Sequence, residues 1–159
     1  MRKATPYLLL AALIGALAWI AVPNLLLAKN RSNQKRTMAD MRTLAQALEA
    51  RATDTHSFGL IATDRKMQVA VGDLRPLRRV RHSELERALV PRYVKSVPRY
   101  DGWEHELDVR ISANTYVVRS LGSDGRAETD RYTPNKTTFR FEDDVVFSEG
   151  TFIQYPEGT

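Results

Sequence analysis

The hydrophobic pattern of the chain changes once, at the end of an apolar run near the N-terminus. Residues 4–28 contain no charged side chain and are mostly aliphatic. At about 1.5 Å of rise per residue, a helix of this length crosses a hydrocarbon layer of about 30 Å. The run is also longer than the roughly 10–14 apolar residues of a typical signal-peptide core. We therefore expect residues 1–28 to form one membrane-spanning helix.

A cleaved signal peptide is the alternative interpretation of this run. Residues 1–3 would form its basic start, and the small residues Ala16 and Ala18 fit the positions before a cleavage site. Apolar residues nevertheless continue beyond Ala18 to Leu27, where a mature protein would be expected to become polar. The pattern favours a helix that is retained.

An amphipathic helical pattern follows over residues 29–53. Apolar residues recur at steps of three and four, with charged and polar residues at the positions between them. The apolar positions are Met38, Met41, Ala45, Leu48 and Ala52. Pro23 lies shortly before this pattern and is expected to bend the helix without ending it, because helical patterning resumes on both sides.

The middle of the chain is less regular. Residues 54–80 have no clean period and contain glycine and proline, which predicts a long variable loop with one short strand at 67–71. Ser83 followed by Glu86 is a capping-box pattern, in which the serine hydroxyl caps the first turn of a helix. We expect a short helix here that ends before Pro91.

Two hairpins are expected in the last third of the chain. Asp101-Gly102-Trp103 predicts a turn, and the alternating residues 107–111 predict a strand whose natural partner is 115–121. Residues 112–114 would join them as a three-residue loop, in which Asn114 can accept a left-handed conformation. Residues 145–148 and 151–155 predict a second hairpin around Glu149-Gly150.

This order of elements predicts an α+β fold. A single globular domain over residues 29–159 would consist of helix 29–53, the loop 54–80 and a small antiparallel sheet within 100–156. The apolar stripe of the helix would cover one face of that sheet.

The net charge of +5 and the pI of about 9.7 raise the question of nucleic-acid binding. Asp64 and Asp73 interrupt the basic residues of this region, and the region lacks aromatic side chains for base stacking. A solvated surface is therefore the favoured interpretation. The basic residues concerned are Arg65, Lys66, Arg75, Arg78, Arg79 and Arg81.

The residues that carry chemistry do not form a catalytic pattern. His56, His82 and His105 are far apart in sequence, and Gly122-Ser123-Asp124-Gly125 lacks the strand-to-helix context of a nucleophile elbow. The absence of cysteine excludes disulfides and thiolate metal sites and is compatible with either the cytoplasm or the periplasm. We expect no enzymatic activity.

One oxygen-rich cation site can be considered from the residues alone. Asp124 and the acidic cluster 142–144 would meet if residues 127–141 formed a loop between the hairpins, and carboxylates suit a hard cation such as Ca²⁺. The simpler interpretation is a turn at Asp124 and a solvated strand start at 142–144, and the residues alone favour it.

Two stretches together resemble the pseudopilins of bacterial type II secretion, which are type IV pilin-like proteins, and above all the major pseudopilin, general secretion pathway protein G. The first is the apolar stretch 13–25 with Pro23, followed by a basic, alanine-rich amphipathic half. The second runs from Asp101-Gly102-Trp103 through residues 116–125, which read Tyr-Val-Val-Arg-Ser-Leu-Gly-Ser-Asp-Gly, to residues 143–147. The resemblance implies a pilin-like fold.

The resemblance also implies a calcium site. In that family an aspartate-glycine loop and a later aspartate bind calcium, and backbone carbonyls complete the shell. By position, the carbonyl of Leu121 and the carboxylates of Asp124 and Asp144 would be the ligands of Ca²⁺ here. Residues 127–141 replace the glycine-rich loop of the family.

Location and partners follow from the same resemblance. It implies a single-pass protein of the bacterial inner membrane with a periplasmic C-terminal domain, although the basic residues after the span would by charge counting place that domain inside. Basic amphipathic halves are common in the family, so we prefer the periplasmic assignment. Implied partners are other pseudopilins, packed through the N-terminal helix, and inner-membrane secretion components; nucleic acid is not an expected partner.

The N-terminus departs from the family pattern. Pseudopilins are made with a basic leader that ends in glycine, followed by a phenylalanine and, shortly after, a glutamate. Alignment on Pro23 places Arg2 at the expected mature start and Pro6 at the glutamate. We therefore expect a chain without the prepilin peptidase motif, permanently anchored as an accessory subunit.

Two other functions compete with this one. A competence-type DNA-uptake module would use the basic residues 75–81 and would bind DNA with a steep salt dependence. A soluble exported protein would be cleaved after Ala18 and would lose the membrane helix.

Overall fold

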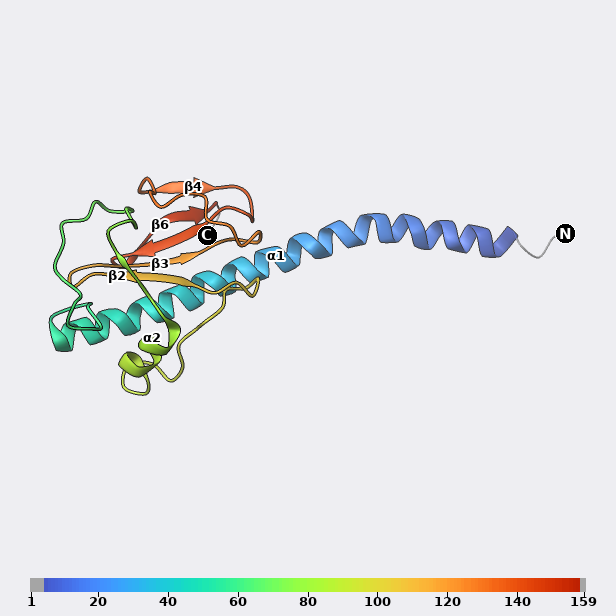
Figure 1. Ribbon diagram of the computed structural model, residues 1–159. Coiled ribbons are helices and arrows are strands. Elements are labelled where there is room, and N and C mark those ends of the chain that lie inside the picture. Colours follow the sequence, from blue (N-terminus) through green and yellow to red (C-terminus); the bar gives the residue numbers. More distant parts are fainter. Residues whose placement is uncertain (1–4, 158–159) are drawn as a thin grey trace. The chain divides into compact units, whose positions relative to one another are not determined.

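The computed structural model describes residues 5–157 and the side chains of residues 12–157. By compactness the chain divides into two units, Met1–Ser32 and Asn33–Thr159. Helix α1, Thr5–Thr55, contributes residues to both (Figure 1). The basic start expected at residues 1–3 lies outside the described residues.

The first unit is an apolar helix. Among the described residues, one helix is long and apolar enough to span a membrane, with a mean hydropathy of 1.7 over its most apolar window. Every side chain from Ala12 to Lys29 is exposed in the isolated chain, including Leu17 and Trp19. The helix contains Pro23 without ending there, as the sequence predicts. These properties are consistent with a single-pass membrane protein.

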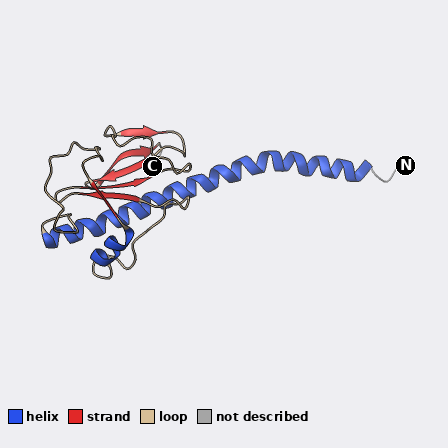
Figure 2. Cartoon of the chain, viewed as in Figure 1, coloured by secondary structure: helices blue, strands red, loops and turns tan. Residues whose placement is uncertain are grey.

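The second unit contains a six-stranded sheet with strand order β1-β2-β3-β5-β6-β4, drawn in red in Figure 2. All neighbouring strands pair antiparallel except β4 and β6, which are parallel. The α+β class is therefore confirmed, but the predicted purely antiparallel sheet is wrong because the sheet is mixed. The elements after α1 are β1 Arg78–Val80, α2 His82–Leu89, β2 Asp108–Ile111, β3 Tyr116–Ser120, β4 Lys136–Thr138, β5 Val145–Ser148 and β6 Thr151–Pro156.

The C-terminal half of α1 covers one face of this sheet. The predicted apolar positions Met38, Met41, Ala45 and Leu48 are all buried, and they form one core with residues of β1, β2, β3 and β5. Alternation along the strands sends the next residues to the opposite face. A second apolar cluster lies there, and it consists of Leu74, Leu77, Val117, Tyr132, Val146 and Ile153.

The loop 54–80 covers part of that second face. The strand predicted at 67–71 is absent. The loop contains strand β1 at its very end. The amide side chain of Asn114 bonds the backbone of Met67 twice, at 2.9 Å each. Asn114 does not take the left-handed conformation that it could accept. The side chain fastens the loop, so the hairpin closes without a positive φ at this residue.

Helix α2 is present and ends before Pro91, as predicted. The expected capping box at Ser83 and Glu86 is absent. The N-cap of α2 is Arg81, which makes no side-chain capping bond. Because the helix begins at His82, Ser83 lies inside the first turn and cannot cap it. The carboxylate of Glu84 instead pairs with Arg78 at 2.8 Å and with Arg81 at 3.0 Å.

Both predicted hairpins are confirmed. Strand β2 pairs with β3, and β5 pairs with β6 around Glu149 and Gly150. Glu149 and Gly150 have φ angles of 49° and 81°, and a two-residue turn between antiparallel strands favours such positive φ values.

Candidate functional site

The two carboxylates predicted to bind calcium both have hydrogen-bond partners within the chain. Asp124 is exposed, and its Oδ1 accepts the N–H of Arg126 at 2.9 Å. Asp144 is fully buried, and its Oδ2 accepts the hydroxyl of Tyr132 and the N–H of Glu128. Within the described part of the chain, no group of three or more His, Asp or Glu side chains could hold a metal ion. Calcium binding through the carbonyl of Leu121 and the carboxylates of Asp124 and Asp144 stays a prediction.

Asp144 belongs to a set of polar residues on the second face of the sheet, which we call the charged network: Asp108, Arg119, Tyr132 and Asp144, which are buried, and Asp130, which is partly exposed. Arg119 lies at its centre and is 4% exposed. Its guanidinium donates to Asp108 at 2.5 Å, to Asp130 at 3.2 Å and to the hydroxyl of Tyr132 at 3.0 Å. The network therefore joins β2 and β3 to the segment that follows β3.

Burial and pairing act against each other in this network. Burial alone would lower the pKa of Arg119, but its bond to Tyr132 and the nearby carboxylate of Asp108 raise it. Burial raises the pKa of Asp144 above its ordinary value, although the bond from Tyr132 works in the other direction. Arg119 thus stays charged, whereas ionised Asp144 is costly.

The sequence pattern missed this network. Alternation assigned Asp108 to the polar side of its strand, yet it is buried, as is Arg119, because the loop 54–80 and Tyr132 cover that side. The observed register places Asp108 directly opposite Arg119, where opposite charges attract. The predicted three-residue loop would instead have placed Asp108 opposite Val118.

The turn at Asp101 has a structural role. Its buried carboxylate accepts the N–H groups of Trp103 and His105 through Oδ1, both at 2.9 Å, and the hydroxyl of Ser120 through Oδ2 at 2.7 Å. The ring Nδ1 of His105 lies 2.9 Å from the carbonyl oxygen of Gly122. The two motifs that carry the family resemblance are therefore bonded to each other.

The turn at residues 101–103 is also hydrogen-bonded to Thr37 of α1. The N–H of Gly102 donates to the hydroxyl of Thr37 at 2.8 Å, and that hydroxyl donates to the carbonyl of Asn33 at 2.9 Å. A Cβ atom at position 102 would collide with this carbonyl oxygen. Only glycine fits where the turn meets the helix.

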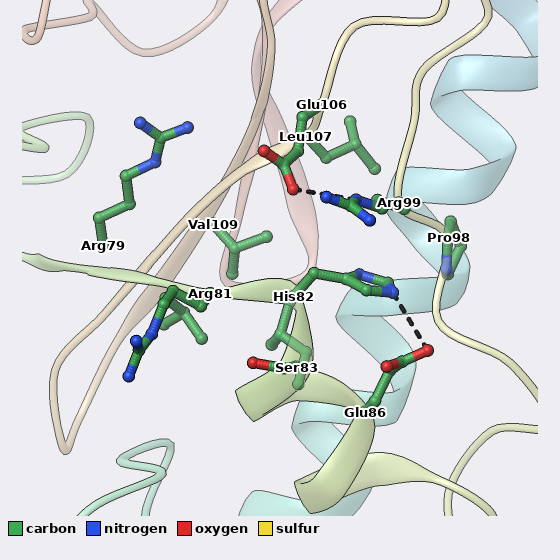
Figure 3. Close-up of a pocket in the computed structure, with 12 residues that line it drawn as sticks. Arg79, Arg81, His82, Ser83, Glu86, Pro98, Arg99, Glu106, Leu107 and Val109 are labelled. Carbon is green, nitrogen blue, oxygen red and sulfur yellow. Dashed lines mark hydrogen bonds and ion pairs between the residues drawn. The ribbon is translucent and has the colours of Figure 1, made fainter.

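A cavity of about 610 Å³ lies between β1, the start of α2 and residues 98–107 (Figure 3). We call it the α2 cavity. Its apolar floor consists of Val80, Leu85, Leu107 and Val109, which are all buried. Its rim carries three arginines, Arg79, Arg81 and Arg99, together with His82, Glu86 and Glu106.

The polar groups of the rim are paired. Nε of Arg99 lies 3.2 Å from Glu106, and Nε2 of His82 lies 3.2 Å from Glu86, as the dashed lines in Figure 3 mark. Ser83 follows His82 directly in the helix, and adjacent helical side chains do not face each other. The histidine and the serine therefore do not form a nucleophile and base pair.

The basic residues considered for DNA binding are also paired. Arg78 bonds Asp64 at 2.6 Å, and Arg75 bonds Asp73 at 2.7 Å. Burial would raise the pKa of Asp64, but the bond from Arg78 and two backbone N–H groups lower it. These two ion pairs join residues within the segment 54–80, which leaves less positive charge for an external polyanion.

Comparisons with protein-family models, with curated proteins and with solved structures find no match for the chain. The link to pseudopilins is therefore a resemblance carried by the apolar helix and by the two motifs at residues 101–103 and 116–125.

Proposed function

We propose that this chain is a structural, pseudopilin-like subunit that supports protein secretion in a bacterial type II secretion or type IV pilus-like system. It is anchored once in the inner membrane, its C-terminal domain lies in the periplasm, and its N-terminal helix packs against helices of other subunits. Its role is mechanical and involves no catalysis. Other pseudopilins and the inner-membrane secretion components are its partners.

One observation carries this proposal. The side chains from Ala12 to Lys29 form an apolar helix whose every member is exposed in the isolated chain. Apolar surface of this extent is stable only in lipid or against other helices. The same helix continues into a domain core at Met38 to Leu48, so the anchor and the domain share one element.

The pairing of the arginines makes the DNA-uptake module the weaker alternative. Arg75, Arg78, Arg79 and Arg81 each contact a carboxylate of this same chain, with distances from 2.6 to 3.2 Å. A DNA phosphate would have to displace or share these partners. Strong DNA binding that falls steeply with salt would favour the alternative.

Two measurements on the full chain in its native membrane test the proposal. Intact mass reports whether the chain keeps residues 1–18, and alkaline extraction reports whether it stays in the membrane. We expect an uncleaved, membrane-retained chain. A chain that begins after Ala18 and is released by extraction would overturn the proposal.

Self-association is tested by single-cysteine cross-linking, which the absence of native cysteine makes clean. Leu17→Cys, in the apolar helix, is expected to give disulfide-linked dimers on mild oxidation in the membrane. Thr151→Cys, at an exposed position of the domain, is the matched control. Equal cross-linking at both positions would contradict packing through the helix.

A further inference from the structure

We propose that the apolar part of α1 pairs with a second copy of the same helix, through hydrogen bonds from the side chain of Asn24 in each copy to the backbone carbonyl of Trp19 in the other. This inference rests on the proposed function, because it takes residues 12–28 to lie in a membrane and to pack against other helices. It adds the partner, which is a parallel copy of this chain, and the face of the helix that the two copies share.

Pro23 leaves one backbone carbonyl of this helix without its usual donor. In an α-helix the N–H of each residue donates to the carbonyl four residues earlier. Helix α1 continues through Pro23, which has no N–H, so the carbonyl of Trp19 loses the donor that residue 23 would supply. Hydrocarbon contains no water to replace this donor, and an unpaired backbone group is costly there. The helix therefore presents a hydrogen-bond acceptor within its apolar run.

Asn24 brings a hydrogen-bond donor to the same region. It has the only amide side chain of residues 12–28, whose other side chains are apolar except for the indole N–H of Trp19. Its side chain is exposed, and within the described part of the chain this amide has no hydrogen-bond partner. Asn24 lies about 6 Å inside the end of the apolar run at Ala28, and its side chain leans toward the helix N-terminus, away from that end. An amide held in lipid commonly finds its partner on a neighbouring helix.

The donor and the acceptor lie at nearly the same depth when two copies are parallel. Copies of a single-pass chain have one orientation in the membrane, so equivalent residues lie at equal depth. The Cα atoms of Trp19 and Asn24 are about 7.5 Å apart along the axis. Helix carbonyls point toward the C-terminus and side chains lean toward the N-terminus, so the two groups approach each other along the axis. The amide of one copy therefore lies beside the free carbonyl of the other.

The two groups also flank one face of the helix. Successive helical residues are about 100° apart, and the free carbonyl lies next to Pro23, so the acceptor and Asn24 stand on either side of this face. In a two-fold pair each copy donates one amide and receives one, which satisfies both groups of both helices. The small side chain at position 16 permits close approach. Four exposed residues lie on this face at steps of three, four and seven residues, as in a seam between parallel helices: Leu13, Ala16, Ile20 and Leu27.

The test uses the full chain in phosphatidylcholine vesicles that contain no other protein. The chain has no cysteine, so Thr151→Cys in each variant can carry one of two fluorescent dyes. Energy transfer between the dyes, measured against the protein-to-lipid ratio, gives the dissociation constant of the pair. We expect Asn24→Leu to weaken pairing by about threefold or more. Pro23→Ala restores the backbone donor and should also weaken pairing; tight pairing of that variant would refute the carbonyl of Trp19 as the acceptor.

A double variant, Asn24→Leu with Leu25→Asn, is the matched control. It keeps the composition of the span and turns the amide by about 100° around the helix. We expect it to pair as weakly as Asn24→Leu, and pairing as tight as that of the original chain would overturn the proposal. Disulfide cross-linking maps the face, because Ile20 and Val22 are both β-branched and exposed but lie about 200° apart around the helix. Ile20→Cys should give several times more dimer than Val22→Cys, and equal amounts would contradict the assigned face.

Failure of this inference can be told apart from failure of the proposed function. A chain released from its native membrane by alkaline extraction would overturn both. A retained chain that pairs equally well with and without Asn24 would overturn only the contact assigned here. A retained chain that stays monomeric in the vesicles would overturn pairing with a second copy, while packing against helices of other subunits would still stand.

Discussion

On the face of the sheet that α1 covers, the buried side chains are mainly apolar, whereas the opposite face buries most of the charged network among a smaller apolar cluster. The first face resembles the interior of most small domains. On the second face, Arg119 and Asp108 are each about 4% exposed and form the shortest ion pair of the charged network, at 2.5 Å. One sheet therefore contains two kinds of interior, and each should respond differently to substitution.

The loss of unfolding free energy when one buried side chain is replaced should differ between the two faces. An apolar core tolerates a smaller side chain through partial relaxation of its neighbours. A buried ion pair adds little net stability when it is complete, but removal of one partner leaves the other charge buried without compensation. The second face should therefore be the more sensitive to single substitutions.

The largest effect is expected for Arg119→Met. This change takes from Asp108 its closest partner, at 2.5 Å, leaving Arg79 and Arg110 each at 3.2 Å, and takes one donor from the hydroxyl of Tyr132. We expect a loss of about 3–5 kcal/mol in the free energy of unfolding. Chemical unfolding of the full chain in micelles, followed by circular dichroism, measures it.

Arg131→Met is the matched control for that experiment. Arg131 is also an arginine paired with an aspartate, at 3.4 Å from Asp73, but it is 68% exposed. We expect its loss to cost less than about 1 kcal/mol. Similar losses in the two variants would show that burial of Arg119 has no special consequence.

A somewhat smaller effect is expected on the apolar face for Leu48→Ala. Leu48 is 1% exposed and packs in the core between α1 and the sheet. Its truncation should cost about 3 kcal/mol, because a cavity remains that neighbouring side chains fill only in part. Gln46→Ala, on the exposed side of the same helix, should change stability by less than about 0.5 kcal/mol. If Leu48→Ala proved costlier than Arg119→Met, the order of sensitivity proposed for the two faces would be reversed.

The same contrast explains which parts of the fold could be predicted from the sequence. Met38, Met41, Ala45 and Leu48 keep a helical period because a single apolar surface covers them, so the pattern predicts both the helix and its buried side. The two hairpins are predictable for a similar reason, since apolar residues alternate along their strands and turn residues separate them.

The second face could not be predicted, because its cover comes from irregular segments. Residues 66–77 and Tyr132 have no period that reveals their position over the sheet, and so Asp108 and Arg119 look solvated in the sequence. Strands β1 and β4 have three residues each, Arg-Arg-Val and Lys-Thr-Thr, which is too short for alternation to appear. Of the candidate sites, the α2 cavity was missed because its lining comes from separate segments that meet only in the fold.

The smallest expected effect is on the pH dependence of the unfolding free energy, and it comes from one carboxyl group of the second face, that of Asp144. Burial raises the pKa of Asp144 above its ordinary value of 3.8. Between pH 3.8 and the raised pKa, the folded protein therefore binds more protons at this site than the unfolded chain does. Stability contributed by Asp144 must then fall as pH rises through this window and level off above it.

Asp144→Asn tests this sign, because asparagine keeps an acceptor for Tyr132 and cannot ionise. Asp64 and Glu84, whose pKa values are lowered, titrate in both proteins and cancel from the difference. Unfolding free energies of the two proteins, measured from about pH 4 to 8, should show the original chain losing stability relative to the variant as pH rises. A difference that instead favours the original chain as pH rises would mean that Arg119, reaching Asp144 through Tyr132, stabilises the ionised carboxylate more than burial penalises it. The second face would then be a stabilising ionic core, and its sensitivity would come from lost attraction instead of from uncompensated charge.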